Sequence, residues 1–327
     1  MSTPGFPLFR PHPLLFHGHL QTLPAFFGAG ADYPYAARQH QVELEDKDRI
    51  VLHDDCPGRW QPSDRSALLI HGLGGSYRSP YLVRIAARLN QHGVRTFRMD
   101  LRGCGAGAGL ARRPYHAGQS DDVAAALRYL AEVCPQSPTA LVGFSLGGNL
   151  ALKLLGEGGP RPPGNLDRTM AICPPIDLAA AVGSLDKLLN RYYDRYFVRR
   201  LLRQASKNKA LRPDAPALDF PHRPRRLYEF DDLYTAPVCG FGRADNYYQR
   251  CSSLHLVGNI KVPTLVLAAR DDPMIPVALF ERAAWPSAVR LELTDHGGHL
   301  GFISRAGPHP DRRWLDGRVV HWVMHQR

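Results

Sequence analysis

The sequence has no run of apolar residues long enough to cross a membrane. Its longest apolar stretch, near residues 141–155, is interrupted by glycine, serine, asparagine and lysine, whereas a spanning helix needs about 20 predominantly apolar residues. The first sixteen residues lack a basic segment followed by an apolar one, and prolines at positions 4, 7, 11 and 13 disfavour a helix there. We therefore expect no signal peptide and a cytoplasmic location.

Paired cysteine motifs are also missing. The six cysteines are scattered along 327 residues, and none forms a C-x-x-C pair. A chain of this length builds a sizeable core without disulfides to hold it together. We expect six reduced thiols and no structural zinc site.

Nucleic-acid-binding modules are absent too. There is no zinc-finger spacing, no glycine-aromatic RNA-binding signature and no basic helix that continues into heptads. The formal charge is nevertheless +11, most of it from arginine. This charge favours either a solvated basic surface or contact with an acidic membrane or anionic substrate, and we expect no nucleic acid as partner.

The composition is that of a folded protein, with 44% hydrophobic and 22% charged residues and no internal repeat. Short apolar runs, typical of strands buried on both faces, alternate with helical patterns, of which 81–91 and 122–133 are the clearest. The expected strands are 67–70, 94–99, 139–142, 169–173, 264–268 and 289–293. The alternation predicts a single α/β domain over residues 1–327, with a mainly parallel sheet flanked by helices.

One long segment interrupts the alternation. Residues 174–260 contain no strong strand pattern and are rich in aromatic and basic residues. Residues 191–226 alone hold eleven Lys or Arg against three Asp or Glu, a net of +8. An insertion of this size between two core strands is typical of a helical lid or cap over a site. We refer to residues 174–260 as the cap, and its charge favours weak contact with an anionic membrane surface.

A nucleophile motif follows the expected strand at 139–142. Gly143-Phe144-Ser145-Leu146-Gly147 is a G-x-S-x-G pentapeptide between a predicted strand and a predicted helix. The serine must stand above the sheet on a strained turn, and the two glycines remove side chains that would collide there. Because the pentapeptide alone occurs by chance, its position carries the assignment of Ser145 as nucleophile.

A glycine-rich turn ends the expected strand at 67–70. The sequence His71-Gly72-Leu73-Gly74-Gly75 lets the backbone approach a bound carbonyl closely. We assign the backbone N–H groups of Leu73 and Leu146 as the oxyanion hole, with an ordinary glycine turn as the alternative. His71 is interpreted as structural.

The acid and the base are expected after the two strands that follow the cap, in the order serine, acid, histidine. Two aspartates and two histidines compete for these roles. We choose Asp272 over Asp271, since the acid in such loops usually lies four residues before the loop proline. We choose His299 over His296, because it follows a flexible Gly-Gly pair that allows the imidazole to reach the serine. A metal site on the two histidines lacks a clear third ligand.

Together these motifs resemble the YheT-like α/β-hydrolases, also called the AB-hydrolase 4 family. The resemblance covers nearly the whole chain and includes segments outside the motifs above. These segments are His19-Leu20-Gln21-Thr22-Leu23, Ser79-Pro80-Tyr81, Arg102-Gly103-Cys104, Tyr115-His116, Glu229-Phe230-Asp231-Asp232, Tyr247-Tyr248 and Cys251-Ser252.

The resemblance implies an α/β-hydrolase fold with a helical lid and a triad on Ser145, Asp272 and His299. It also implies hydrolysis of carboxylic esters, small-molecule or lipid, without a metal or organic cofactor. Two alternatives stay open. One is an acyltransferase that passes the acyl group to an alcohol, and the other is a non-catalytic binding protein on the same scaffold.

Overall fold

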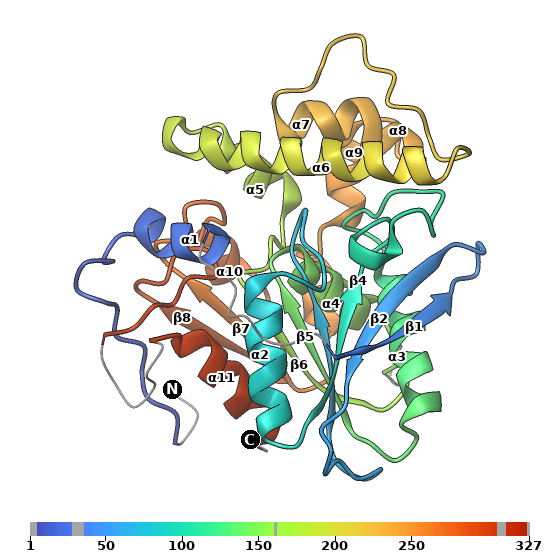
Figure 1. Ribbon diagram of the computed structural model, residues 1–327. Helices are drawn as coiled ribbons and strands as arrows, with labels where there is room; N and C mark the ends of the chain where they lie inside the picture. The colour runs from blue at the N-terminus through green and yellow to red at the C-terminus, as the bar shows by residue number, and fades with distance from the viewer. Residues whose placement is uncertain (1–4, 28–35, 160–161, 306–311, 326–327) are drawn as a thin grey trace.

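The computed structural model describes residues 5–27, 36–159, 162–305 and 312–325. Its centre is one eight-stranded sheet with the strand order β1-β2-β4-β3-β5-β6-β7-β8 (Figure 1). The strands are β1 (Arg38–Glu43), β2 (Arg49–Asp55), β3 (Ser66–Ile70), β4 (Arg95–Asp100), β5 (Thr139–Phe144), β6 (Leu166–Ile172), β7 (Thr264–Ala269) and β8 (Val289–Thr294).

Strands β3 to β8 are parallel, and only the pairs β1–β2 and β2–β4 are antiparallel. All six predicted strands are present, with ends that differ by at most three residues from the expected ranges. The central strands β3 and β5 are buried at every position, which explains their uninterrupted apolar sequences. The prediction of a mainly parallel sheet is confirmed.

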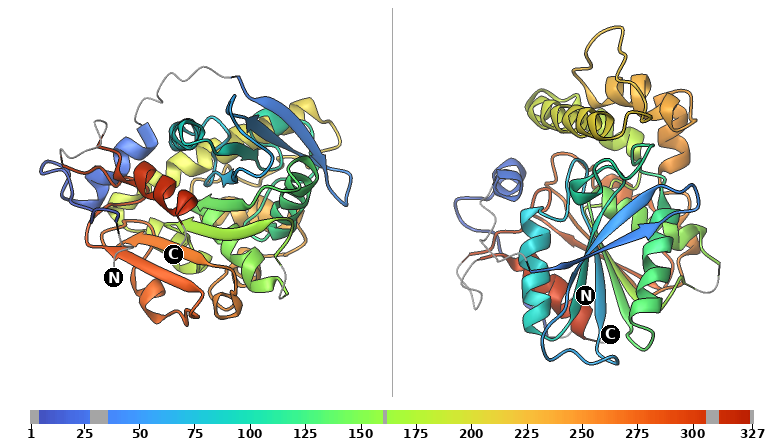
Figure 2. Two further views of the ribbon diagram at one scale, coloured as in Figure 1. Left: turned by 90° about the horizontal axis from the view of Figure 1, so that it is seen from below. Right: turned by 45° about the vertical axis from the view of Figure 1, so that its right-hand side comes forward.

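Helices cover both faces of the sheet (Figure 2). Helices α2 (Pro80–Gln91) and α11 (Trp314–Met324) pack on one face, against Ala67 and Leu69 of β3 among others. Helices α3 (Ser120–Val133), α4 (Leu146–Glu157) and α10 (Ala278–Arg282) lie on the other, where Leu68 and Ile70 point. Alternate residues of β3 thus serve two apolar layers, as the period of a strand requires.

The cap joins β6 to β7 and lies over the carboxyl ends of the parallel strands (Figure 1). Within the described residues it contains no strand. Its elements are α5 (Leu178–Leu185), η2 (Leu188–Asn190), α6 (Arg191–Leu211), α7 (Leu227–Phe230), the π-helical turn η3 (Asp231–Thr235), α8 (Ala236–Val238), α9 (Ala244–Cys251) and η4 (Val257–Asn259).

Two further helical elements lie outside the cap and the layers that cover the sheet. Helix α1 (Gly18–Phe27) lies beside the carboxyl edge of the sheet, and the short turn η1 (Gly105–Gly107) follows β4. No helix in the described ranges combines the length and the apolar character needed to cross a bilayer. The six cysteines all lie in these ranges, and no two of them form a disulfide.

Candidate active site

Ser145 lies on the sharp turn between β5 and α4. Its backbone has φ 50° and ψ −117°, a conformation that a non-glycine residue seldom adopts. A side chain at Gly143 would collide with the backbone of Gly147, and one at Gly147 would collide with Ile70. The two glycines therefore allow helix α4 to start directly behind the strained serine.

The structure brings Ser145, His299 and Asp272 together in a hydrogen-bonded row. His299 Nε2 lies 2.9 Å from Ser145 Oγ, and His299 Nδ1 lies 2.8 Å from Asp272 Oδ2. The side chains of His299 and Asp272 are almost completely buried, at 2% and 1% exposure. The other oxygen of Asp272 accepts the backbone N–H groups of Met274 and Ile275, which fixes the carboxylate toward the imidazole.

The competing pair lies outside this row. Asp271 accepts the N–H of Gly298, while its second oxygen lies 3.3 Å from Nδ1 of His296. The side chain of His296 is 42% exposed. Asp271 thus braces the loop that carries His299.

The two expected oxyanion donors flank the serine. Gly72 and Gly74 donate their backbone N–H groups to the hydroxyls of Tyr81 and Tyr115, each at 2.9 Å. The N–H groups of Leu73 and Leu146 have no hydrogen-bond acceptor among the residues that the structure describes. Buried N–H groups rarely stay unpaired, and two beside a serine are suited to a developing oxyanion.

His71 takes no part in this arrangement. It is fully buried, and its two ring nitrogens lie 2.8 Å from the carbonyl oxygen of Gly72 and 3.3 Å from the backbone nitrogen of Leu101. Burial lowers its pKa, and the nearby Arg200 contributes in the same direction. The imidazole therefore braces the glycine turn, which agrees with the structural interpretation.

A metal ion has one candidate cluster in the described residues, formed by Cys173, Asp272 and His299. Asp272 and His299 already bind each other, and burial raises the pKa of the Cys173 thiol well above its usual value. A neutral thiol is a poor metal ligand. The donor set therefore fits a proton-transfer pair better than a metal site.

The loop that carries His299 is strained and is held by helix α1. Gly297, Gly298, Leu300 and Phe302 all have positive φ angles. Side chains at Gly298 or Gly301 would collide with the backbone of α1. Strained segments persist only where the surroundings determine their conformation.

Two buried residues of α1 make the specific contacts. Thr22 Oγ1 accepts the backbone N–H of His299 at 2.9 Å and donates to the carbonyl of Gly18. Gln21 bonds both the N–H and the carbonyl of Ile303. These contacts were not predicted, although both residues belong to a segment that carries the family resemblance. No local sequence pattern signals a contact with a loop 277 residues away.

Two cavities meet at Ser145. An apolar cavity of about 80 Å³ runs beneath the cap, and its wall reaches from Ser145 to Asp231. Its apolar lining consists mainly of Leu178, Ala181, Val182, Leu185, Met274 and Ile275. The second is a more polar opening between the glycine turn and α6, with Arg78 and Arg200 in its wall. The site thus offers one mainly apolar compartment beneath the cap and one more polar compartment with two arginines in its wall.

Comparison with known proteins gives concordant results. A family profile described as "alpha/beta hydrolase fold" matches residues 68–306. The chain is 34% identical to the candidate esterase YheT of Escherichia coli, over 93% of this chain and 89% of that protein. It is 26% identical to medium-chain fatty acid ethyl ester synthase/esterase 2 of Saccharomyces cerevisiae, over 91% of this chain and 82% of that protein.

Solved structures show the same architecture. The esterase Pf2001 of Pyrococcus furiosus superposes with a TM-score of 0.57 at 17% identity, and the match covers 90% of this chain and 96% of that one. At this identity the likeness concerns the fold.

Proposed function

The chain belongs to the α/β-hydrolase fold family, and on that premise we propose that it is a serine hydrolase that cleaves carboxylic esters through an acyl-enzyme on Ser145. The observation that carries the proposal is the row Ser145–His299–Asp272 beside two backbone N–H groups without an acceptor in the described structure. A serine hydroxyl is a weak nucleophile, and this row supplies the base and the orienting acid that it needs.

In the proposed mechanism, Ser145 Oγ attacks the ester carbonyl while Nε2 of His299 takes its proton. Asp272 holds the imidazole in the required tautomer and stabilises its charged form. The N–H groups of Leu73 and Leu146 bind the oxyanion, and each such donor is typically worth about 10²–10³ in rate. His299 then protonates the leaving alcohol, and water activated by the same imidazole releases the acid.

An acyltransferase is the second candidate, because the yeast relative is named both a synthase and an esterase. The two activities share the acyl-enzyme and differ in whether water or an alcohol accepts the acyl group. We expect the free acid as the main product from a series of p-nitrophenyl esters, with or without about 1 M ethanol. Conversion mainly to the ethyl ester would favour the transferase. Failure of a fluorophosphonate probe to label Ser145 would favour a non-catalytic protein.

Thr22 is proposed as a positioning residue for the base. Thr22→Val preserves the shape of the side chain but leaves the buried N–H of His299 without an acceptor. We expect kcat to fall about 10–100-fold with little change in KM, because a small displacement of a catalytic group is costly. Thr22→Ser should restore most of the rate.

Thr139→Val is the matched control. It also removes a buried hydroxyl contact, the 2.9 Å bond between Thr139 and Ser66, but at the opposite end of β5 from Ser145. It should lower the melting temperature and leave kcat unchanged. Equal loss of kcat in both valine variants would mean that Thr22 acts only through stability.

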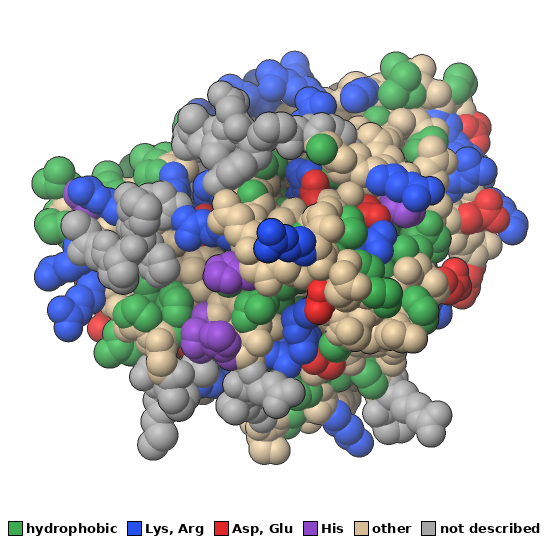
Figure 3. Space-filling view, turned by 60° about the horizontal axis from the view of Figure 1, so that its bottom comes forward, with side chains coloured by type: hydrophobic (Ala, Val, Ile, Leu, Met, Phe, Trp, Pro, Cys, Tyr) green, Lys and Arg blue, Asp and Glu red, His purple; other side chains and the backbone are tan. Residues whose placement is uncertain are grey.

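We also propose that the cap contacts anionic membrane surfaces. A groove on the cap is lined mainly by Arg191, Arg195, Arg199, Arg223, Arg225 and Arg226. Among described residues, only Arg226 of these six lies within ion-pair distance of a carboxylate, that of Asp186. The underside of the molecule instead carries interspersed basic and acidic side chains (Figure 3). The groove wall also contains Asp194 and Glu229, but six arginines against two acidic residues leave it basic. A basic surface of this kind favours anionic lipid.

Vesicles with 30% anionic lipid should therefore sediment the protein at low salt and release it at high salt. Reversal of Arg195, Arg199 and Arg223 to glutamate should abolish sedimentation, since each basic residue near the surface contributes about 1 kcal/mol. The same reversal at the exposed residues Arg128, Lys261 and Arg282 is the charge-matched control. Equal binding to neutral and anionic vesicles would contradict the proposal and would mean that the basic groove of the cap is simply a solvated surface.

A further inference from the structure

Asp231 is a buried carboxyl group with no basic partner among the described residues. It begins the π-helical turn η3 in the cap and is 6% exposed. It interacts with the hydroxyls of Tyr248, at 2.8 Å, and Thr235. No Lys, Arg or His of the described chain lies within ion-pair distance of it. Buried carboxylates in proteins are normally paired with a cation, so the missing partner requires an explanation.

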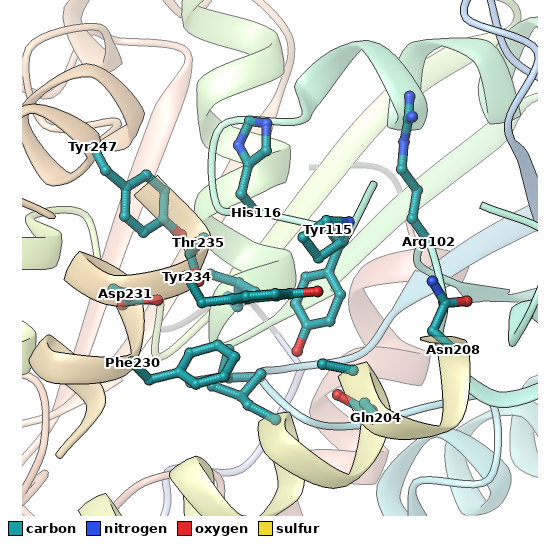
Figure 4. A pocket seen from close by; sticks show the side chains of 16 residues that line it. Arg102, Tyr115, His116, Gln204, Asn208, Phe230, Asp231, Tyr234, Thr235 and Tyr247 are labelled. Atoms are coloured by element: carbon teal, nitrogen blue, oxygen red, sulfur yellow. The ribbon is translucent and has the colours of Figure 1, made fainter. Parts of the chain in front are cut away.

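Asp231 faces a small chamber with aromatic walls (Figure 4). Rings from the core and the cap line it, namely those of Tyr115, His116, Phe230, Tyr234 and Tyr247. Its volume of about 40 Å³ is room for about three water molecules. A group with four or five heavy atoms is of comparable size.

The other charged and titratable groups of the chamber do not neutralise Asp231. Arg102 lies on the far side, where its guanidinium binds Asp46, Asp48 and Asp122 (Figure 4). Burial, together with nearby positive charges, lowers the pKa of His116 to about 3, so its ring is neutral.

The phenols carry no charge either, and Asp231 itself is close to ionisation. Burial raises the pKa of Tyr234 to about 12 and that of Tyr247 well above its usual value. Burial also raises the pKa of Asp231 to about 7, against hydrogen bonds from Thr235 and Tyr248 that lower it; Asp194 adds a smaller upward shift. Asp231 is therefore the group in this chamber that a bound cation would convert fully to its charged form.

The chamber adjoins the candidate active site. It shares Leu73, Leu146, Asp231 and Tyr247 with the apolar cavity that begins at Ser145. Leu73 and Leu146 are the two proposed oxyanion donors. Ser145 and Asp231 both line the apolar cavity, so a chain attached to a carbonyl at Ser145 has apolar side chains beside it and Asp231 in the wall of the same cavity.

We propose that this chamber binds an ammonium group, so that the substrates are esters whose acyl chain ends in a cationic amine. The inference rests on the proposed ester hydrolysis at Ser145. Aromatic rings attract a cation through their negative faces, and the attraction is strongest where water is excluded. Asp231 supplies the opposite charge, and the apolar cavity supplies the space for the connecting chain.

Two isosteric esters test the proposal directly. The p-nitrophenyl ester of 6-(trimethylammonio)hexanoic acid carries the charge, and the ester of 7,7-dimethyloctanoic acid replaces the nitrogen by carbon. At pH 8 we expect kcat/KM for the charged ester to exceed that for the neutral one by about tenfold or more. In Asp231→Asn the ratio should fall to about one or below. Asp232→Asn is the matched control, because Asp232 pairs with Arg243 and does not line the chamber. This variant should keep the preference for the charged ester.

A second measurement is independent of turnover. Tetramethylammonium should raise the melting temperature of the wild type at pH 8, but not that of Asp231→Asn or Tyr234→Leu. Without the salt, Asp231→Asn should melt higher than the wild type at pH 8 and close to it at pH 4. An acid whose pKa is raised from 3.8 to about 7 by folding destabilises the folded state as the pH rises between these two values, and asparagine does not ionise.

The outcomes separate the two proposals. Equal turnover of both esters and no shift with tetramethylammonium would overturn the ammonium site, provided that a fluorophosphonate still labels Ser145. Absence of labelling and of turnover for both esters would instead overturn the ester hydrolase, whatever the thermal shift shows.

Discussion

Replacing Ser145 with alanine is expected to abolish ester hydrolysis and to leave the protein folded. We propose that the hydroxyl oxygen of Ser145 forms the bond to the acyl group, so its loss prevents formation of the acyl-enzyme. Triad knockouts in serine hydrolases cost on the order of 10⁴–10⁶ in kcat. The measurement is kcat on a p-nitrophenyl ester, together with a melting curve for each variant.

The fold should tolerate this change well. Ser145 is already in a strained conformation with φ 50°, and alanine adopts it at a similar cost. Ser137→Ala is a suitable control, because it removes a buried hydroxyl that bonds Asp64, far from the site. If Ser145→Ala keeps a tenth of the activity or more and its melting curve is unchanged, the assignment of Ser145 as the nucleophile is wrong.

Substitution of His299 by alanine should be as damaging as the loss of Ser145, whereas His296→Ala should be mild. The reason is geometric: Nε2 of His299 lies 2.9 Å from Ser145 Oγ, while His296 is exposed and faces Asp271. Because the members of a triad act as a unit, the double variant Ser145→Ala/His299→Ala should be scarcely worse than either single variant.

The two aspartates provide the corresponding comparison. Asp272→Asn should lower kcat by about 10⁴, because an amide favours the wrong tautomer of the imidazole. In Asp271→Asn, the amide oxygen still accepts the N–H of Gly298, so the loop stays in place. An inactive His296→Ala or Asp271→Asn variant beside an active His299→Ala would show that the base has been misassigned.

Local sequence patterns predicted the central sheet well. Strands β3 and β5 are apolar throughout because both of their faces are covered, and this makes them conspicuous. Strands β1 and β2 were both missed. Strand β1 is an edge strand with mostly exposed, polar residues, Arg-Gln-His-Gln-Val-Glu, and β2 has only three consecutive apolar residues, Ile50-Val51-Leu52. Helix α1 was missed because it contains Pro24 and has no acidic residue in its first turn.

The candidate site, too, contains residues that the sequence predicted and contacts that it did not. Ser145, Asp272 and His299 each lie in a short motif at the end of a strand, and the order of the motifs limited the candidates to one serine, two aspartates and two histidines. The loop proline and the Gly-Gly pair then led to the prediction of Asp272 and His299, which the structure places in one hydrogen-bonded row with Ser145. The contacts of Thr22 with His299, and the chamber around Asp231, join segments far apart in the sequence. Such juxtapositions depend on tertiary packing and leave no periodic signal in a single sequence.

The contact between Thr22 and His299 also bears on the synthesis of the protein. Ser145 leaves the ribosome 154 residues before His299, which at 5–20 residues per second is roughly 8–30 s. During that interval the nascent chain presents a nucleophile without its base, and helix α1 has no histidine loop to hold. On the proposed mechanism, a growing chain therefore has no hydrolase activity until the loop that carries His299 has been made and has packed against helix α1.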